Sequence, residues 1–333
     1  MDYRQVKAIN NSLMSVYEDN YLQFIANWVN NVPIPDKSDN SLTLGTLIDV
    51  LITANETYND KFIIYDGDVP TGQVLKFCEL LAKKCKDPDL AHLYYDQIYD
   101  EIEIKSPVLA KFISTKFEPA EEYYKFLLRN NDKKTISNKQ DSIAKQKYDE
   151  LQQNPYTARF INVKNSDTVE VHNQLELYYK YKSLPIKGAL DRVLISHEKK
   201  IVQPIDFKTS HNIGDFKHSY YEYKYYRQAS FYNYLLKQWM IEKGISDYEI
   251  KPFIFVVCST TSTSHWCYKV SQNDLEMAEN GGYTYFGKYI KGWKQILDEI
   301  DYNSAVSWQF PYECLINNGI VELNLFSINP GII

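Results

Sequence analysis

Long apolar runs and cysteines are both scarce in this 333-residue sequence. No stretch reaches the roughly 18 uncharged apolar residues that a membrane-spanning helix needs, and residues 1–4 do not resemble the start of a signal peptide. The five cysteines are an odd number and include no Cys-x-x-Cys pair, so neither a disulfide framework nor a structural zinc site is indicated. We therefore expect a cytoplasmic protein with reduced thiols and no membrane partner.

The signatures of several common enzyme classes are also missing. There is no Gly-x-Ser-x-Gly motif, and the six histidines show no His-x-x-x-His spacing. Residues 67–73 have the glycine spacing of a Walker phosphate-binding loop but lack its lysine. The sequence thus disfavours a serine hydrolase, a histidine-ligated zinc enzyme and a P-loop nucleotide-binding protein.

Tyrosine is what the sequence has in excess, with 29 residues against 15 Phe and 5 Trp. An apolar ring with a polar hydroxyl suits grooves and wet surfaces as well as cores, although codon bias gives the same enrichment. The net charge of −6 is unevenly placed, because residues 103–228 carry +6 and the rest −12. A basic middle on an acidic chain is compatible with a nucleic-acid groove and equally with solvated helix faces.

The apolar periodicity changes from helical to strand-like along the chain. Helical spacing predicts helices within the first 30 residues, at 41–54, over most of 72–131 and at 138–153. Alternating spacing then predicts strands at 169–171, 175–181, 186–195, 200–207, 250–258 and 265–270. Two further helices are predicted at 220–243 and from 273 to about 300, the second interrupted near residue 281. The predicted fold class is α/β.

Two acids and a lysine follow each other on the central predicted strands. Asp191 and Asp206 lie near the ends of strands joined by a tight turn, so antiparallel pairing brings the two carboxylates side by side. Such a pair is costly unless a cation sits between its members. Asp206 and Lys208 are two residues apart in a strand and so leave the same face. This combination suits holding a divalent ion, orienting a water and neutralising a phosphodiester in its transition state.

Gln228 and Tyr232 add uncharged polar groups on the next predicted helix. They are four residues apart and therefore share one helix face, where they can contact a phosphate or a DNA strand. Simpler interpretations stay open for each motif: a helix packing pair for these two residues, a charge pair at a strand edge for Asp206 with Lys208, and a turn pair for Asp191 with Arg192.

Taken in order, these motifs resemble the PD-(D/E)XK nuclease superfamily, in its RecB-like and phage-type exonuclease branch, which includes lambda exonuclease and exodeoxyribonuclease VIII. That branch shows Gly-x-x-Asp, then Asp/Glu-x-Lys, then Gln-x-x-x-Tyr. The matching residues are Gly188 with Asp191, Asp206 with Lys208, and Gln228 with Tyr232. The resemblance covers about residues 41–60 and 135–300.

The family also carries an upstream helix with a His or Glu near the metal, often as Gly-Thr-x-x-His. Here Gly45 and Thr46 are followed by Asp49 in that place. Aspartate is an adequate ligand for a hard metal, and a solvated helix residue is the alternative interpretation of Asp49.

The resemblance implies a restriction-endonuclease-like core with a central mixed β-sheet flanked by helices. It further implies a single nuclease domain over 1–333, with catalytic core strands and helices at 168–300 and a mainly helical insertion at 61–134. The implied site residues are the metal ligands Asp49, Asp191 and Asp206, with Lys208, Gln228 and Tyr232 completing the catalytic set. Lys187, Arg192, Thr209 and Arg227 are predicted DNA contacts, for which surface solvation is the alternative.

The implied function is a deoxyribonuclease that uses one or two Mg²⁺ or Mn²⁺ ions, most closely a phage-type exonuclease of recombination or repair. An endonuclease of the same fold and an inactive DNA-binding or assembly protein remain alternatives. The implied partners are DNA, a single-strand annealing protein and a second copy of the chain, in the host cytoplasm if the protein is phage-encoded. The iron–sulfur cluster of some relatives is not expected, because Cys258, Cys267 and Cys314 are too dispersed.

Overall fold

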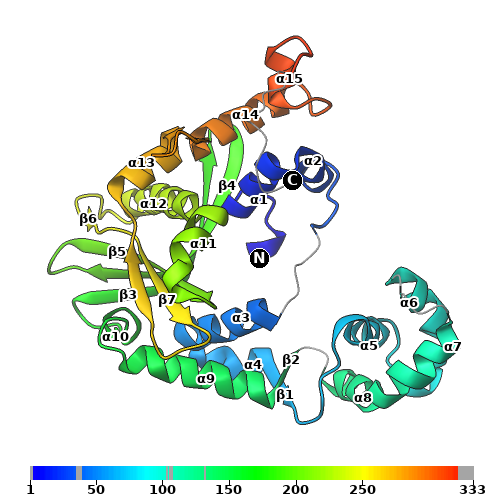
Figure 1. The fold of residues 1–333 in the computed structure, drawn as a ribbon. Helices are drawn as coiled ribbons and strands as arrows, with labels where there is room; N and C mark the ends of the chain where they lie inside the picture. Colours follow the sequence, from blue (N-terminus) through cyan, green and yellow to red (C-terminus); the bar gives the residue numbers. More distant parts are fainter. Residues whose placement is uncertain (1–2, 35–39, 103, 105–107, 131–132, 322–333) are drawn as a thin grey trace. The chain divides into compact units, whose positions relative to one another are not determined.

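The computed structural model describes residues 3–34, 40–102, 104, 108–130 and 133–321 (Figure 1). The chain divides into two compact units, each of which is described by itself. Unit 1 comprises Met1–Lys37 and Asn154–Ile333, and unit 2 comprises Ser38–Gln153. No helix in the described part of the chain is long and apolar enough to span a membrane.

Unit 1 is built on a central mixed β-sheet, as the α/β prediction required. Its strands are β3 (Val169–Tyr181), β4 (Leu184–Ser196), β5 (Ile201–Ser210), β6 (Glu249–Ile250), β7 (Ile254–Ser259) and β8 (Trp266–Lys269). The order is β3-β4-β5-β7-β8, with β6 beside the start of β5. All neighbours are antiparallel except β5 with β7 and β5 with β6, which are parallel. The crossover from β5 to β7 is helical, as parallel neighbours require.

The helices of unit 1 flank this sheet. They are α1 (Asn11–Asp19), α2 (Tyr21–Trp28), α10 (Ala158–Ile161), α11 (Phe216–Glu222), α12 (Tyr225–Glu242), α13 (Gln272–Asn280), α14 (Trp293–Val306) and α15 (Tyr312–Ile316). The central helix α12 lies against β3 and β4 (Figure 1). Burial of apolar side chains drives this packing, and the main core joins residues of α1, α2, α12 and α14 to the sheet: Met14, Phe24, Leu177, Ile186, Leu190, Phe231, Leu235 and Trp293.

Four predicted elements in unit 1 differ from the structure. The strand predicted at 250–258 is two strands, β6 and β7. Residues 169–181 form one long strand rather than two. The helix predicted at 220–243 is two helices, because Lys224 adopts the left-handed backbone conformation at φ 55° and breaks the helix between α11 and α12. The last predicted helix is also two, α13 and α14, separated by the short hairpin strands β9 (Gly282–Tyr283) and β10 (Tyr289–Ile290).

Unit 2 is mainly helical. Its α-helices are α3 (Asn40–Thr53), α4 (Tyr58–Lys61), α5 (Gly72–Lys84), α6 (Tyr95–Glu101), α7 (Leu109–Phe112), α8 (Glu121–Arg129) and α9 (Asn138–Gln153). Strands β1 (Phe62–Tyr65) and β2 (Lys134–Ser137) pair in parallel. Strand β2 was not predicted, because its sequence is polar except for the buried Ile136 and so shows no alternation of apolar residues. The predicted insertion at 61–134 lies inside this unit, and the single-domain organisation stays a prediction.

Gly188 allows α12 to approach β4 closely. A Cβ atom at this position would lie 2.5 Å from Leu235 Cδ1 and 3.0 Å from Tyr232 Cε1. Real Cβ atoms do not tolerate the first distance, so an added methyl group must displace the helix or distort Leu235. The glycine of the Gly-x-x-Asp motif therefore has a packing role.

We expect Gly188→Ala to lower the free energy of unfolding by about 1–3 kcal/mol, the usual cost of overpacking a filled core. Gly214→Ala is the matched control, because its Cβ would meet Asn212 Oδ1 at an ordinary 3.5 Å. Urea denaturation of both variants measures the difference. Equal stability of the two would show that α12 does not depend on the missing side chain at Gly188.

Candidate active site

The candidate site lies where β4 and β5 separate. Their antiparallel ladder runs from Ser196–Ile201 to Arg192–Ile205. Beyond that pair the described register joins β4 to β3 and β5 to β7. Asp191 and Asp206 are the first residues past the last shared pair, one on each strand. Their side chains therefore lie at the point where the sheet opens between two neighbouring strands.

Asp191 is held at this opening by a local break in the β3–β4 ladder. The register includes Asn173–Arg192 and Leu175–Leu190 but omits Gln174 opposite Asp191, and Gln174 has φ 48°. The Asp191 carboxylate accepts a hydrogen bond from the backbone N–H of Phe207 at 2.8 Å. The carboxylate thus gives a hydrogen-bond partner to the Phe207 N–H, which points from β5 toward β4 beyond the end of their ladder.

Asp206 is the buried member of the pair, with only 1% of its surface exposed. One carboxylate oxygen forms an ion pair with Lys208 Nζ, and the other accepts a hydrogen bond from Gln228 Nε2 at 2.9 Å. Both oxygens are therefore compensated, which a buried carboxylate needs.

Lys208 is enclosed by acids and aromatic rings, and 17% of its side chain is exposed. Its Nζ lies 4.9 Å from the Tyr225 ring centroid and 5.7 Å from that of Phe255, within cation–π range. Burial alone would lower the pKa of Lys208, but the facing carboxylates of Asp206 and Asp191 raise it above its ordinary value. The ammonium therefore stays charged at neutral pH.

The predicted helix pair also reaches this site. Gln228 on α12 donates to Asp206, and Tyr232 one turn later is close enough to interact with Gln228 and Asp206. Burial, reinforced by the Asp206 charge, raises the pKa of the Tyr232 hydroxyl, so it stays neutral. The structure thus brings together five of the predicted residues: Asp191, Asp206, Lys208, Gln228 and Tyr232.

The three cations predicted to contact DNA are buried and bind the protein itself. Lys187 donates to the carbonyl oxygens of Tyr3 and Val6, each at 2.7 Å. Arg192 donates to the carbonyls of Phe160 and Ile161 at 3.1 and 2.7 Å.

Arg227 follows the same pattern on α12. It forms an ion pair with Glu18 and donates to Asn11 Oδ1 at 3.1 Å. These partners give Lys187, Arg192 and Arg227 structural roles that correct the prediction of exposed phosphate contacts. Thr209 is half-buried on β5 opposite Cys258, on the face of the strand away from Lys208.

Asp49 lies on helix α3 of unit 2. Its backbone carbonyl accepts a hydrogen bond from Thr53 Oγ1 at 2.8 Å. Its place in the site stays a prediction.

The donor set suits a hard divalent cation. Among the residues that the structure describes, no three His, Cys, Asp or Glu side chains gather into a metal site. Mg²⁺, however, is commonly held by one or two carboxylates that share it with water and substrate phosphate oxygens. The Asp191–Asp206 pair fits that pattern, with Lys208 close enough to share an anionic ligand.

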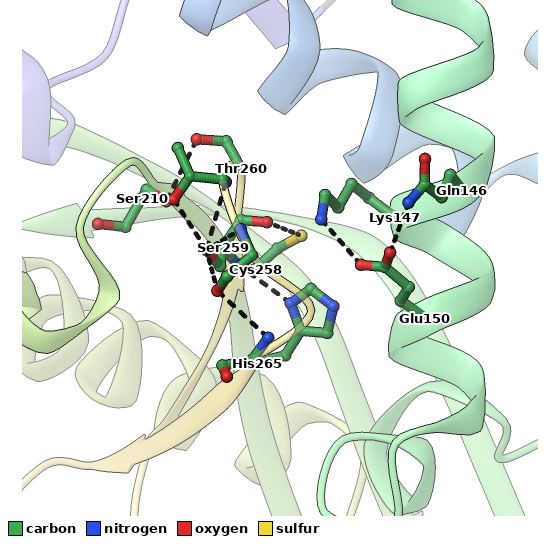
Figure 2. A network of polar contacts seen from close by, with 11 residues as sticks. Gln146, Lys147, Glu150, Ser210, Cys258, Ser259, Thr260 and His265 are labelled. Atoms are coloured by element: carbon green, nitrogen blue, oxygen red, sulfur yellow. Dashed lines mark hydrogen bonds and ion pairs between the residues drawn. The ribbon is translucent and has the colours of Figure 1, made fainter.

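A polar network that the sequence did not predict lies at the ends of β5 and β7, around Ser210 and Ser259 (Figure 2). The Ser259 N–H donates to His265 Nδ1 at 3.1 Å, and the Ser259 hydroxyl accepts from the Ser262 N–H at 3.0 Å. The Thr260 N–H donates to the Ser210 carbonyl at 3.0 Å, which ties the ends of β5 and β7 together. The Ser/Thr-rich run at 259–264 was its one sequence signal, and the network fixes the strand that carries Lys208.

No protein-family model matches the sequence, and no curated protein matches it. Among solved structures, the chain is similar to a proposed exonuclease from Eubacterium rectale. The two sequences are 11% identical, the match covers 96% of this chain and 91% of that chain, and the TM-score is 0.47. A likeness at this TM-score establishes neither fold nor function, so the function has to be inferred from the residues of the site.

We expect Lys208→Met to lower the free energy of unfolding by about 3–5 kcal/mol, because it leaves the buried Asp206 carboxylate without its counter-charge. The double variant Asp206→Asn with Lys208→Met should recover most of that loss, since no uncompensated charge then remains. Urea denaturation in EDTA at pH 8 measures both. Additive losses in the double variant would show that the two side chains do not compensate each other.

Proposed function

We propose that unit 1 is a metal-dependent nuclease of the PD-(D/E)XK type, with a restriction-endonuclease-like core, that hydrolyses DNA phosphodiester bonds. One observation carries the proposal: two carboxylates, an ammonium and an amide converge where β4 and β5 separate. A buried cluster of this kind costs stability relative to an apolar core. Its chemistry matches the needs of phosphodiester hydrolysis, which are a cation site and a positive charge next to it.

Asp191 and Asp206 would hold Mg²⁺ or Mn²⁺, and the resemblance of the motifs makes Asp49 a proposed third ligand. When bound, the ion supplies Lewis-acid polarisation of the phosphate and a lower pKa for a bound water. Asp206 can turn toward such an ion without losing all compensation, because Gln228 holds its other oxygen.

Lys208 would orient or help deprotonate the attacking water and offset the charge that develops on the phosphate. Its Nζ faces the Asp206 carboxylate, next to the proposed cation site. Tyr232 stays neutral and can offer its hydroxyl to the DNA strand, while Gln228 fixes the orientation of Asp206.

The finer proposal is a phage-type exonuclease of recombination or repair, acting with a single-strand annealing protein or as an oligomer; it rests on the resemblance of the motifs. Incubation with linear and with closed-circular duplex DNA, each with Mg²⁺, Mn²⁺ or EDTA, tests it. Degradation of the linear form alone, dependent on the metal, supports an exonuclease. Cleavage of the circular form makes the protein an endonuclease, and no cleavage of either leaves a DNA-binding or assembly role.

Asp206→Asn should reduce cleavage of linear DNA by more than about a hundredfold, because loss of a ligand should exceed the 10–100-fold effects seen for groups that only support ligands. The fold should persist, because Asp191 remains as a counter-charge to Lys208 and the amide keeps most of the shape and part of the hydrogen bonding. Asp215→Asn, at an exposed acid on the same unit, is the control and should cleave normally. Cleavage by Asp206→Asn at the control's rate would remove Asp206 from the mechanism.

Asp49→Asn tests the third ligand separately. We expect it to raise the Mg²⁺ concentration needed for half-maximal cleavage by about 10-fold or more, since one charged oxygen ligand is lost. Asp60→Asn, an exposed acid on α4 of the same unit, should leave the metal titration unchanged. Superimposable titrations for both variants would make Asp49 an ordinary helix residue.

A further inference from the structure

The hairpin between α13 and α14 carries two almost fully exposed aromatic rings at its tip. Tyr285 is 97% exposed and Phe286 is 92% exposed, the highest values for large hydrophobic side chains in the part of the chain that the structure describes. Single exposed apolar residues are ordinary on protein surfaces, but adjacent exposed aromatics usually mark an interaction site. The question is what these two rings contact.

The tip is an ordered turn. The Thr284 N–H donates to the Lys288 carbonyl at 2.8 Å, and the Gly287 N–H donates to the Thr284 carbonyl at 2.9 Å. Gly287 supplies the positive φ, 76°, that closes the turn. The cross-strand rings of Tyr283 and Tyr289 lie 5.1 Å apart in an edge-to-face arrangement below the tip.

The base of the hairpin is anchored to α14 through Gln295. Its Oε1 accepts hydrogen bonds from the Tyr289 hydroxyl at 3.0 Å and from the Gly292 N–H at 2.9 Å. A Cβ at Gly281 would lie 2.3 Å from the same oxygen. The hairpin thus presents Tyr285 and Phe286 from a braced base, and this pre-organisation lowers the entropy cost of binding.

The hairpin itself is aromatic and carries two lysines and no acid over residues 281–292. Lys291 pairs with Glu299 of α14 at 2.7 Å, so Lys288 is the cation beside the tip. Lys288 Nζ lies 5.2 Å from the ring centroid of Tyr221, whose ring stacks on Tyr226.

Ring contacts at the α11–α12 junction link this part of the surface to the candidate site through the protein interior. Tyr220 contacts both Tyr226 and Phe255, and Phe255 contacts Tyr225. Tyr225 in turn lies over Lys208 Nζ. Lys288 of the hairpin and the proposed catalytic lysine therefore border one packed aromatic cluster, which is buried at Phe255.

We propose that the Tyr285–Phe286 tip is a stacking platform for unpaired nucleotides of the DNA strand that reaches Lys208. This inference rests on the proposed function and adds the substrate class, a DNA with a single-stranded portion. Nucleobases stack on aromatic rings with little sequence preference, and a neighbouring lysine attracts the phosphate backbone. The absence of acids from residues 281–292 favours a polyanionic partner over a protein surface of mixed charge.

The test is fluorescence anisotropy of a labelled oligothymidylate of about 20 nucleotides, longer than the roughly 4–16 nucleotides that one such module covers. The full chain is used in EDTA, so that binding is measured without cleavage. Tyr285→Ala with Phe286→Ala should raise the Kd at least about tenfold, from a loss of roughly fivefold or more per stacked base. Tyr156→Ala, an exposed tyrosine of unit 1 outside the hairpin, should bind as the wild type does.

Two further double variants separate stacking from apolar contact. Replacement of both residues by Leu should weaken binding nearly as much as replacement by Ala, and replacement of both by Trp should retain it. Wild-type affinity in the Ala or Leu variant would overturn the proposal, as would no oligonucleotide binding by the wild type. A change in sedimentation coefficient with unchanged DNA affinity would overturn it in favour of a self-association surface. Because the assay needs no metal, its outcome is distinguishable from a failure of the cleavage experiment.

Discussion

The burial of the Asp206 carboxylate is the constraint on which the arrangement of unit 1 depends. A carboxylate removed from water costs several kcal/mol unless charge and hydrogen bonds replace the lost solvation. Here the replacement comes from two directions, Lys208 on the same strand and Gln228 on α12. The first needs only the two-residue period of a strand, whereas the second needs α12 to lie close to the sheet. Gly188 allows this close approach, so the hydrogen bond from Gln228 to the buried carboxylate depends on the glycine in β4.

Such a cluster is difficult to explain by stability alone. An apolar residue at position 206 would pack beside its β7 partner Phe255 without any counter-charge. Buried ion pairs are often replaced by apolar groups with no loss of stability. The separation of β4 from β5 beyond Arg192 and Ile205 also leaves the Phe207 amide without a strand partner on that side, and Asp191 serves it instead. The sheet therefore departs from regular structure twice at one place, by a buried charged residue and by the separation of two neighbouring strands. Such departures are typical of functional sites.

Local periodicity accounts for the parts of the structure that could be predicted. The convergence of Asp206, Lys208, Gln228 and Tyr232 follows from the i, i+2 and i, i+4 rules once the elements are known, and helix α9 has the predicted bounds. The predictions that failed depended on distant segments. The cations Lys187, Arg192 and Arg227 are buried by the carbonyls and side chains of Tyr3, Phe160 and Glu18, and no local pattern reveals such partners. The break at Lys224 was missed because lysine is an ordinary helix former and no local pattern signals its left-handed conformation here.

These buried cations also change the meaning of the charge pattern. The net +6 of residues 103–228 counts every lysine and arginine as available to a polyanion. Three of the basic residues in that segment are engaged inside unit 1, and Lys224 pairs with Glu18 and Asp19 at its surface. Segment charge therefore overstates the attraction of this region for a DNA backbone, because a buried cation cannot contact a phosphate and a cation paired with an acid is offset locally. Attraction must come from the exposed cations, of which Lys288 on the hairpin is one. With fewer cations available to phosphates, uncharged contacts to the bases matter more, which gives the exposed aromatic rings a larger share of the binding free energy.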